Sequence, residues 1–467
     1  MKRRTSTGWT FAIVSTALFM VVLDNLVVTN ALPSIKRDLG ATIQQLEWTV
    51  NAYTLSYAVL LLTGAALGDR FGRRRVFSLG LALFTLASAA AALAPSTSAL
   101  IAARAIQGIG AAIVTPLTLT LLNEAVPDDK RGLALGAWSG ISGLAVALGP
   151  VVGGAVVTGI SWHWIFWLNV PIGLIAAPLA MFRLSESHGE SRGLDFPGLG
   201  LASAGLLGVV YGIVHASSAG WTATTVVGSI ALGIVLLGAF VAWELRAPEP
   251  MLPMSFFKSR AFSATNGVSI AMYFGTFGSI FLLAQFFQVA QHYSALQSGL
   301  RILPWTVMPI FIAPIAGALS DRIGGRPLMA AGLAFQGAGL AWLAAMMSPT
   351  VAYIDLVPGF VMAGTGMALV FAPAANTVLG AVRPKQAGQA SGATNAMREL
   401  GGVLGVSVLA TVFSGAGGFV SPQSFVDGIV PAVTVGSAVL FAGALAALLV
   451  PGKRREQAHP NTETVTA

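Results

Sequence analysis

The chain has 467 residues, of which 55% are hydrophobic and only 9% are charged, and its formal net charge is +8. Ordinary globular domains carry roughly 25% charged residues, and disordered chains are charge-rich and poor in apolar residues. The composition therefore excludes a water-soluble surface as well as a disordered chain, and lipid is the solvent that suits it. The chain has no cysteine, which excludes a disulfide framework and a thiolate metal site or nucleophile.

Apolar runs of membrane-spanning length follow one another along the chain. A helix needs about 20 residues to cross a hydrocarbon core roughly 30 Å thick. The first run follows a basic start, but it is too long for the apolar region of a signal peptide and lacks a suitable cleavage site, so we expect an uncleaved span. Charged or turn residues bound fourteen such runs, at 9–32, 47–68, 76–95, 99–122, 133–157, 163–183, 197–216, 224–244, 262–290, 298–318, 327–347, 353–379, 389–413 and 430–450.

The placement of the basic residues supports fourteen spans. With that number, 21 of the 26 lysines and arginines fall at the termini or in loops on the same side, and only Lys36 and Arg37 fall in the opposite loops. The positive-inside rule then places both termini in the cytoplasm of a protein of the cell membrane. The positive charge thus reflects topology, and we expect the lipid bilayer but no nucleic acid as a partner. The chain has no phosphate-binding loop, so we expect no ATP hydrolysis.

Two loops on the basic side read alike. "GDRFGRRR" at 68–75 matches "SDRIGGRP" at 320–327, with Asp69 and Asp321 separated by 252 residues. Further along, "GIGAAIV" at 108–114 matches "GTGMALV" at 364–370 with a separation of 256 residues. A nearly constant separation over this distance indicates an internal duplication.

The separation also predicts the domain organisation. It exceeds the length of six helices with their loops by about 60 residues, which is the size of the segment with the seventh and eighth spans. Transporters are often built from such repeats, with the substrate site between them near the middle of the membrane. We expect an all-α polytopic protein with an N-terminal six-helix half (1–192), a two-helix insert (193–260), a C-terminal six-helix half (261–452) and a disordered cytoplasmic tail (453–467).

The repeated loop is a candidate gate. Topology alone explains its cations, but the order Asp-Arg-x-Gly occurs twice, and glycine permits the tight reversal because it tolerates positive φ. An aspartate here is placed to pair with a neighbouring arginine or with a helix N-terminus. The candidate gate residues are Asp69, Arg70, Gly72, Arg73, Arg74, Asp321, Arg322, Gly324 and Arg326.

The fifth span is rich in glycine. Small residues spaced by four let helices approach closely in lipid, and a proline removes a backbone donor and favours a bend. We expect either a moving helix interface or ordinary tight packing at Gly143, Gly149, Pro150, Gly153 and Gly154. The same span contains a G-x-S-G match around Ser142, with His215 or His163 as a partner, which leaves an intramembrane serine protease as a remote alternative.

Two charges lie inside spans of the first half. Asp24 is about eight residues and Arg104 about five residues from the same side of the membrane, which places them at depths of roughly 12 Å and 7 Å. Their side chains can meet at one depth, and pairing would reduce a cost of roughly 2.5–3.5 kcal/mol for each charge. The alternative is that Arg104 extends to the interface instead.

Other polar side chains inside spans are candidates for a substrate cavity. Arg398 and Glu399 are adjacent in sequence and so point to different faces of their helix. The full set of candidates is Asn25, Asn30, Tyr53, Gln107, Tyr273, Gln285, Gln288, Asn376, Arg398 and Glu399.

Residues 9–450 resemble the major facilitator superfamily, and within it the fourteen-span drug:proton antiporters. "GDRFGRRR" resembles that superfamily's loop between the second and third helices, and "RAIQGIGAA" is similar to its fourth-helix motif. "GLAVALGPVVGG" resembles the fifth-helix signature of antiporters, and "LDNLVVTNALP" resembles the first-helix motif of the fourteen-span group. The chain departs from that last motif at Leu26, Thr29 and Asn30, which contribute to the contacts of the first helix.

The resemblance implies roles for these residues. Asp24 would take part in proton coupling or cation binding, and Arg104 would assist proton transfer. Asp69 with its arginines would stabilise an outward-facing state by bridging toward the thirteenth span. Gly149, Pro150 and Gly153 would shape the contact between the halves. The implied function is proton-driven export of small, mostly apolar or cationic molecules by alternating access, without a cofactor or enzymatic activity. Export of an endogenous metabolite, a lipid or a self-made antibiotic remains the alternative.

Overall fold

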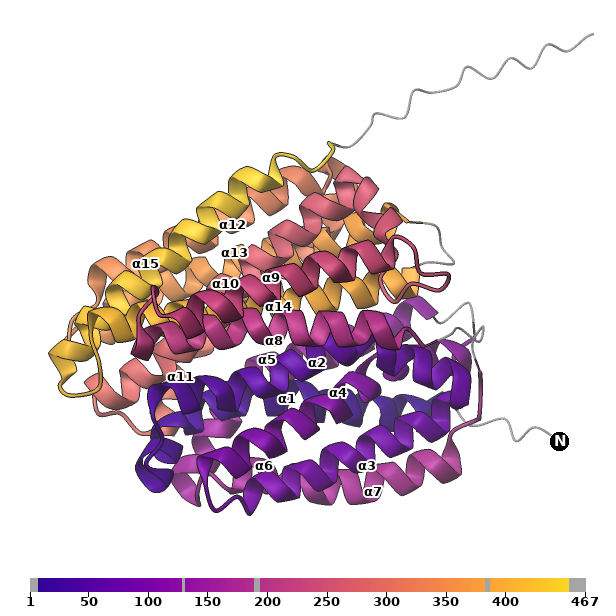
Figure 1. The fold of residues 1–467 in the computed structure, drawn as a ribbon, viewed down its shortest axis with the longest axis horizontal. Helices are drawn as coiled ribbons and strands as arrows, with labels where there is room; N and C mark the ends of the chain where they lie inside the picture. Colours follow the sequence, from indigo (N-terminus) through magenta and orange to yellow (C-terminus); the bar gives the residue numbers. More distant parts are fainter. Residues whose placement is uncertain (1–6, 128–130, 189–193, 383–386, 453–467) are drawn as a thin grey trace, which may run out of the picture.

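The computed structural model describes residues 7–127, 131–188, 194–382 and 387–452, and this part of the chain is helical. Figure 1 shows the arrangement. In chain order the helices are α1 (Thr7–Leu39), α2 (Ile43–Phe71), α3 (Arg73–Ala92), α4 (Thr97–Ala125), α5 (Arg131–Gly159), α6 (Trp164–Trp167), α7 (Asn169–Arg183), α8 (Phe196–Ala219), α9 (Thr224–Glu244), the 3₁₀ turn η2 (Met254–Lys258), α10 (Arg260–Gln285), the π-helical turn η3 (Phe286–Ala290), α11 (Ala295–Ile323), α12 (Gly325–Met346), α13 (Tyr353–Gly380), α14 (Ala387–Ala416) and α15 (Pro422–Ala447).

The helices are long and apolar enough to cross a membrane many times. Thirteen spans meet that description within the described residues, where α6 and α7 together make one span and α10 with η3 another. The α-helix α5, of 29 residues, supplies the fourteenth and has a shorter apolar stretch over Gly143–Gly159. The chain is therefore a multi-pass membrane protein.

The loop between the second and third spans is shorter than the sequence predicts. Only Gly72 separates α2 from α3, and its φ of 102° lies in the region that favours glycine. Gly324 separates α11 from α12 in the same way, with a φ of 85°. The amphiphilic ends of these helices extend beyond the apolar runs, which explains why hydropathy alone predicts a longer loop.

The caps of α2 and α11 repeat as well. Thr42 and Gln45 form a capping box at the start of α2, and Ser294 and Gln297 form one at the start of α11. In a capping box the two side chains satisfy backbone donors that the first helical turn leaves free. The two boxes are separated by the same 252 residues as the two gate loops, so whole helical hairpins correspond.

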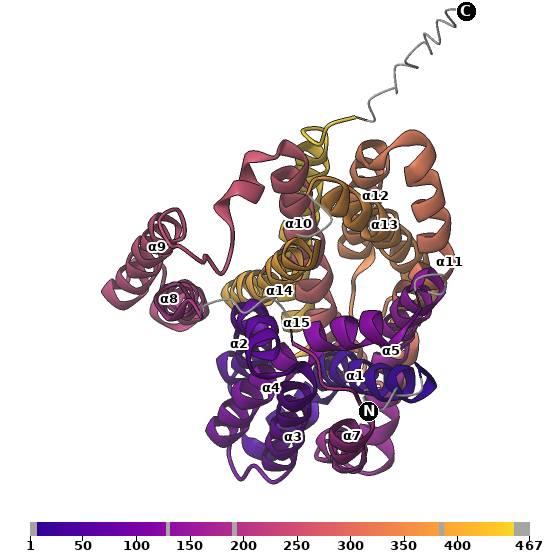
Figure 2. The same cartoon turned by 90° about the vertical axis from the view of Figure 1, so that its right-hand side faces the viewer.

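The helices form two groups with a pair beside them. Helices α1 to α7 lie in the lower part of Figure 1, and α10 and α12 to α15 lie in the upper part, with α11 at the left beside the lower group. Seen from the end of the bundle, α5 lies beside α11 and α2 lies beside α14, so the groups meet along two seams (Figure 2). The boundaries 1–192, 193–260 and 261–452 stay predictions.

The insert, α8 and α9, stands outside the bundle along the seam between α2 and α14 (Figure 2). Val210 and Val214 of α8 share a hydrophobic cluster with Leu55 of α2 and Val403 of α14. Thr411 of α14 also donates a hydrogen bond to the carbonyl of Ile213, at 3.0 Å. The insert therefore covers one seam between the two groups of helices.

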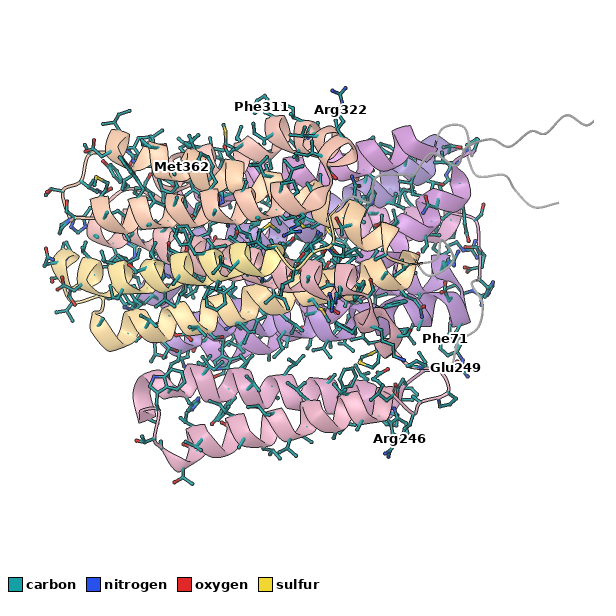
Figure 3. The ribbon with its side chains drawn as sticks, turned by 90° about the horizontal axis from the view of Figure 1, so that it is seen from above. Phe71, Arg246, Glu249, Phe311, Arg322 and Met362 are labelled. Carbon is teal, nitrogen blue, oxygen red and sulfur yellow. The ribbon has the colours of Figure 1, made fainter. Side chains whose placement is uncertain are left out.

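Two faces of the molecule are distinguished below. The basic face contains the turns at Gly72 and Gly324, and the opposite face contains the ends of α1 and α14 and the starts of α2 and α11. Phe71, Arg246 and Glu249 lie toward the same end of the bundle, on the basic face (Figure 3).

The two groups of helices are joined at the opposite face and near the middle. Gln288 of η3 donates to the carbonyl of Asn30 at 3.0 Å, and the Leu296 amide donates to Thr158 at 3.0 Å. Asn51 of α2 donates to Ser407 of α14 at 2.9 Å. Nearer mid-helix, Thr306 of α11 donates to the Ala147 carbonyl of α5 at 3.5 Å. Hydrogen bonds between the two groups therefore hold the opposite face together.

Candidate functional site

Asp24 of α1 lies at the centre of a buried polar cluster. Its carboxylate accepts hydrogen bonds from Arg104 at 2.5 Å, Gln107 at 2.9 Å and Asn169 at 2.7 Å. These four side chains are at most 2% exposed. Hydrogen bonds between charged partners are the strong ones, and a buried charge needs partners of this kind. The carboxylate of Asp24 is thus fully engaged.

The cluster extends around the Arg104 guanidinium and Ser88. Arg104 also donates to Gln107 at 2.7 Å and to the Thr49 carbonyl at 3.2 Å, and it lies 4.2 Å from the centre of the Tyr53 ring. Ser88 accepts from Gln107 and Asn169 and donates to a backbone carbonyl. We call Asp24, Ser88, Arg104, Gln107 and Asn169 the Asp24 cluster.

Four helices bring the Asp24 cluster together. Asp24 comes from α1, Ser88 from α3, Arg104 with Gln107 from α4, and Asn169 from the start of α7. Arg104 is 0% exposed and points into the protein, so it does not extend to the interface. Arg104 and Gln107 are three residues apart and therefore share one face of α4.

Sequence reasoning missed Ser88 and Asn169. Asn169 has a usable sequence signal, because it is an amide inside an otherwise apolar span, like Asn25, Asn30 and Asn376. Ser88 carried none, because serine is common in transmembrane helices at small-residue contacts. Gln107 and Tyr53 are predicted to line a substrate cavity. In the structure Gln107 donates a hydrogen bond to Asp24, and the ring of Tyr53 packs against Arg104.

A second group of polar and aromatic side chains lies where α14 meets α10 and α13. The Arg398 guanidinium lies 4.8 Å from the centre of the Phe371 ring, and Tyr273 packs against the same ring at 6.4 Å. Glu399 lies within electrostatic range of Tyr273 and of Tyr57 from α2. We call Tyr57, Tyr273, Phe371, Arg398 and Glu399 the Arg398 cluster.

The Arg398 cluster has unused hydrogen-bonding groups. Arg398 is 7% exposed, yet its Nε and Nη2 have no hydrogen-bond partner among the described residues, and neither does Oε2 of Glu399. Buried polar groups are nearly always paired, so such atoms call for an explanation. A cation, an anion and several rings with free hydrogen-bonding capacity are suited to a bound organic molecule.

The remaining cavity candidates lie elsewhere. Gln288 and Asn30 join the two groups of helices at the opposite face, and Gln285 donates to a carbonyl of its own helix. Asn25 is half-buried, and Asn376 is exposed on α13. The structure does not bring these five residues into the Arg398 cluster.

Helix α5 contacts α1 and α11 through its small residues. A Cβ on Gly153 would lie 2.8 Å from the Val27 carbonyl, and one on Gly154 would lie 2.3 Å from that of Ala295. The Pro150 carbonyl accepts a hydrogen bond from Asn30 at 2.5 Å. A Cβ on Gly149 would lie 2.6 Å from the Cβ of Leu26, so this glycine also permits a close contact. Gly143 differs, because a Cβ there would meet open space.

The gate loop binds within its own half. Asp69 accepts from Arg73 at 2.8 Å, and Arg73 also pairs with Glu124 of α4. Arg74 and its neighbour Arg75 pair with Glu186, which follows α7. No ion pair or hydrogen bond joins Asp69 to α14 in the ranges that the structure describes.

The remaining gate residues contribute less to this loop. Arg70 lies over the Phe71 ring at 5.5 Å. In the second copy Arg322 and Arg326 are exposed, and Arg322 projects outward in Figure 3. The side chain of Asp321 lies outside the described residues.

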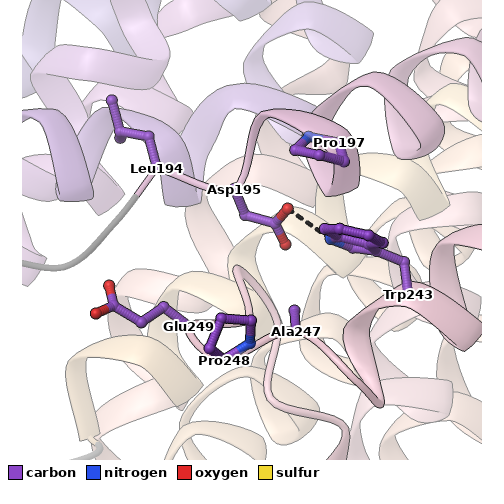
Figure 4. Close-up of a pocket in the computed structure, with 7 residues that line it drawn as sticks. All are labelled: Leu194, Asp195, Pro197, Trp243, Ala247, Pro248 and Glu249. Atoms are coloured by element: carbon purple, nitrogen blue, oxygen red, sulfur yellow. Dashed lines mark hydrogen bonds between the residues drawn. The ribbon is translucent and has the colours of Figure 1, made fainter.

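Two cavities lie away from both clusters. One of about 840 Å³ is at the opposite face, lined by the ends of α1 and α5, by η3 and by Phe419, over which Lys36 lies at 3.4 Å. The other, of about 230 Å³, lies between the start of α8 and the end of α9 (Figure 4). There Asp195 caps α8 by accepting from Gly198 and also accepts from Trp243 at 2.7 Å, which fastens the two insert helices together.

Comparison with known proteins decides the family. Residues 14–406 match the model of the Major Facilitator Superfamily. The chain belongs to this superfamily. It is a transporter of the superfamily fold, and a solved auto-inhibited peptide transporter of the POT family shares that fold, with a TM-score of 0.67 at 16% identity over 95% of this chain and 96% of the other.

Curated relatives are similar over most of their length. The Tetracenomycin C resistance and export protein of Streptomyces glaucescens is 32% identical over 91% of this chain and 79% of its own length. The Puromycin resistance protein of Streptomyces alboniger is 33% identical over 98% and 94%. The Cephamycin export protein of Amycolatopsis lactamdurans is 37% identical over 90% and 87%.

Membership in a transporter superfamily argues against the intramembrane serine protease hypothesis. The side chain of Ser142 lies outside the described residues. His163 stacks on Trp162 at the opposite face, and His215 stacks on Tyr211 in the insert, so each of them packs on an aromatic ring. The chain is a transporter and not an enzyme.

Proposed function

We propose that this protein exports small organic molecules across the cell membrane in exchange for protons. The observation that carries the proposal is the Asp24 cluster, in which one buried carboxylate is held by Arg104 at 2.5 Å. Burial favours the neutral form of a carboxyl group and a nearby cation favours the charged form, so a movement that changes either contact binds or releases a proton.

The energy source follows from this chemistry. When a proton binds the carboxylate of Asp24, the charge attraction to Arg104 is lost, and the four helices that meet there are free to shift. Protons then enter on one side and leave on the other while the substrate moves in the reverse direction. No cofactor is required, because the proton gradient supplies the energy.

The two faces have different roles in this scheme. We assign the basic face, and with it both termini, to the cytoplasm on the positive-inside rule. The structure then corresponds to a state closed toward the outside. The pairing of Asp69 with Arg73 instead of α14 supports this assignment, because a bridge from the gate loop to α14 would belong to the state that is closed on the basic face.

The Arg398 cluster is the proposed substrate site. Its rings, its carboxylate and its guanidinium suit apolar or cationic molecules that carry a few polar groups. The names of the relatives support antibiotics and other drugs as the substrate class. Export of a compound made by the same cell stays the second candidate, which the names that include "export" favour.

Transport by the purified protein tests the proposal. In proteoliposomes with a pH gradient, the wild type should accumulate ethidium or puromycin against its gradient, and Asp24→Asn should not. The variant should keep counterflow, which is the exchange of labelled for unlabelled compound without a proton gradient. Uphill accumulation by Asp24→Asn at the wild-type rate would refute the assignment of Asp24.

A further inference from the structure

Glu47 is a buried carboxyl group that the Asp24 cluster does not use. It lies in the first turns of α2 and is 0% exposed. Neither of its carboxylate oxygens has a hydrogen-bond partner among the described residues, whereas the Asp24 carboxylate accepts from three side chains. An unpaired carboxylate is among the costliest groups to bury in a protein.

The position of Glu47 is at the seam between the two halves. It precedes Asn51 by one helical turn and so shares its face of α2, and Asn51 crosses the seam to Ser407 of α14 at 2.9 Å. The two helices lie side by side (Figure 2), and they are antiparallel because α2 begins and α14 ends at the opposite face. Thr411 follows Ser407 by one turn, so it occupies the position on α14 that corresponds to Glu47 on α2. The single proton of the Thr411 hydroxyl is already shared between the carbonyls of Ser407 and Ile213.

No neighbouring charge compensates Glu47. None of the titratable or charged groups on the helices packed against α2 bonds to it. The guanidinium of Arg104, which donates to the carbonyl of Thr49, is also engaged by Asp24 and Gln107. The groups on the packed helices are Asp24, Lys36, Arg37 and Asp38 on α1, Arg73, Arg74 and Arg75 on α3, Arg104 and Glu124 on α4, Tyr211 and His215 on α8, and Arg398 and Glu399 on α14.

We propose that Glu47 is a second proton-binding residue of the transport cycle, which must take up a proton before α2 and α14 close over it. Closure without the proton would bury an ionised carboxylate that has neither donor nor counter-charge. When the seam opens at the opposite face, the carboxyl group meets the solution there and releases the proton to water. The inference rests on the alternating access of the proposed function.

This arrangement separates two tasks. Asp24 sits deeper, with Arg104, and its proton drives transport, whereas the proton on Glu47 controls closure of the opposite face. One proton bound only in the closed state changes the closed-to-open ratio by up to about tenfold per pH unit. Acid at that face should therefore close the seam, and alkali should open it.

The absence of native cysteine makes the test direct. Cysteines introduced at Ile43 of α2 and Ala416 of α14, spin-labelled in lipid nanodiscs, report the width of the seam at the opposite face by pulsed electron paramagnetic resonance. Across a range from about pH 5.5 to about pH 8.5, the wild-type background should shift from short to long distances, by up to about tenfold in population per pH unit.

Substitutions at Glu47 identify the group responsible. Glu47→Gln mimics the protonated form and should stay at short distances at every pH. Glu47→Asp keeps a titratable group and should keep the response. The exposed carboxylate Asp38, which accepts from Trp162 at this face, provides the control, and Asp38→Asn should respond like the wild type.

The outcomes separate this inference from the proposed function. A Glu47→Gln variant whose seam still opens with rising pH overturns the inference, as does a wild-type seam whose width is independent of pH. Neither result depends on Asp24, whose role is read from uphill transport in proteoliposomes. Conversely, loss of the seam response in Asp38→Asn alone would assign the proton to Asp38 and also overturn the inference.

Discussion

The protein holds two buried combinations of arginine and carboxylate that differ in how they are paired. In the Asp24 cluster, Arg104 and Asp24 come from different helices and meet at 2.5 Å, with amides completing the shell. In the Arg398 cluster, Arg398 and Glu399 are neighbours in sequence, and both retain atoms without a hydrogen-bond partner among the described residues. Nη2 of Arg104 also lacks a hydrogen-bond partner there, so the difference lies in the carboxylates: that of Asp24 accepts from three side chains, and that of Glu399 keeps an unpaired oxygen. A fully hydrogen-bonded carboxylate is suited to a switch that changes when a proton arrives, and a carboxylate with an unpaired oxygen beside a guanidinium is suited to a ligand.

The largest expected effect compares the two arginines directly. Arg104→Ala leaves a buried Asp24 without its counter-charge, which should lower the free energy of unfolding by about 3–5 kcal/mol and abolish proton-driven transport. Arg398→Ala removes a guanidinium whose Nε and Nη2 form no hydrogen bond among the described residues, and it should cost about 1 kcal/mol or less. Thermal unfolding of the two purified variants measures the difference, and equal losses of stability would contradict the comparison.

The amides of the Asp24 cluster should contribute the next largest effect. Asn169→Ala removes one of three donors to the carboxylate, and a hydrogen bond to a charged group contributes about 1.5–3 kcal/mol. We expect slower uphill transport with substrate binding unchanged, measured as uptake rate and as equilibrium binding of ethidium. Weaker binding at an unchanged transport rate would place Asn169 in the substrate site instead.

Helix α5 provides a matched pair of glycines. Gly154→Ala would place a Cβ 2.3 Å from the Ala295 carbonyl of α11 and should cost about 1–3 kcal/mol, because backbone must move. Gly143→Ala meets open space in the same helix and should be nearly neutral. Unfolding temperature and spin-label distances at the opposite face test the pair, and a Gly143→Ala variant as unstable as Gly154→Ala would disprove the assigned contact.

The smallest effect should be a change in selectivity at the Arg398 cluster. Glu399→Gln removes a carboxyl group that can pair with a bound cation next to several aromatic rings, which should weaken binding of ethidium, a cation, by about tenfold or less and leave an uncharged substrate unaffected. Tryptophan fluorescence titration of the variant measures both affinities. An equal loss of affinity for charged and uncharged compounds would mean that Glu399 supports the fold and does not contact the substrate.

Much of the fold is predictable from the sequence, for physical reasons. Span number follows from hydropathy and the distribution of Lys and Arg, and the duplication follows from the repeated loop at Asp69 and Asp321. The loop around Gly72 was predicted too long, because helices continue past the apolar core when caps and charges allow.

The candidate site was only partly predictable. The depths of Asp24 and Arg104 in the membrane can be calculated from a rise of 1.5 Å per helical residue, and these depths predict that the two side chains can meet. The positions of Ser88 and Asn169 in the Asp24 cluster depend on how α3 and α7 pack, which the hydrophobic periodicity of the sequence does not show. Glu47 is the first residue of an apolar run, and the sequence therefore suggests that it lies at the polar end of a span. Only the packing of α2 against α14 shows that Glu47 is buried.

Proton release on substrate binding is the most direct test of the central claim that Asp24 carries the coupled proton. Purified protein in weakly buffered detergent, with a pH-sensitive dye, should release protons when ethidium is added to the wild type. Asp24→Asn should bind ethidium without that release, while Glu399→Gln should lose affinity for ethidium but still release protons when saturated. Undiminished proton release from Asp24→Asn would contradict the account.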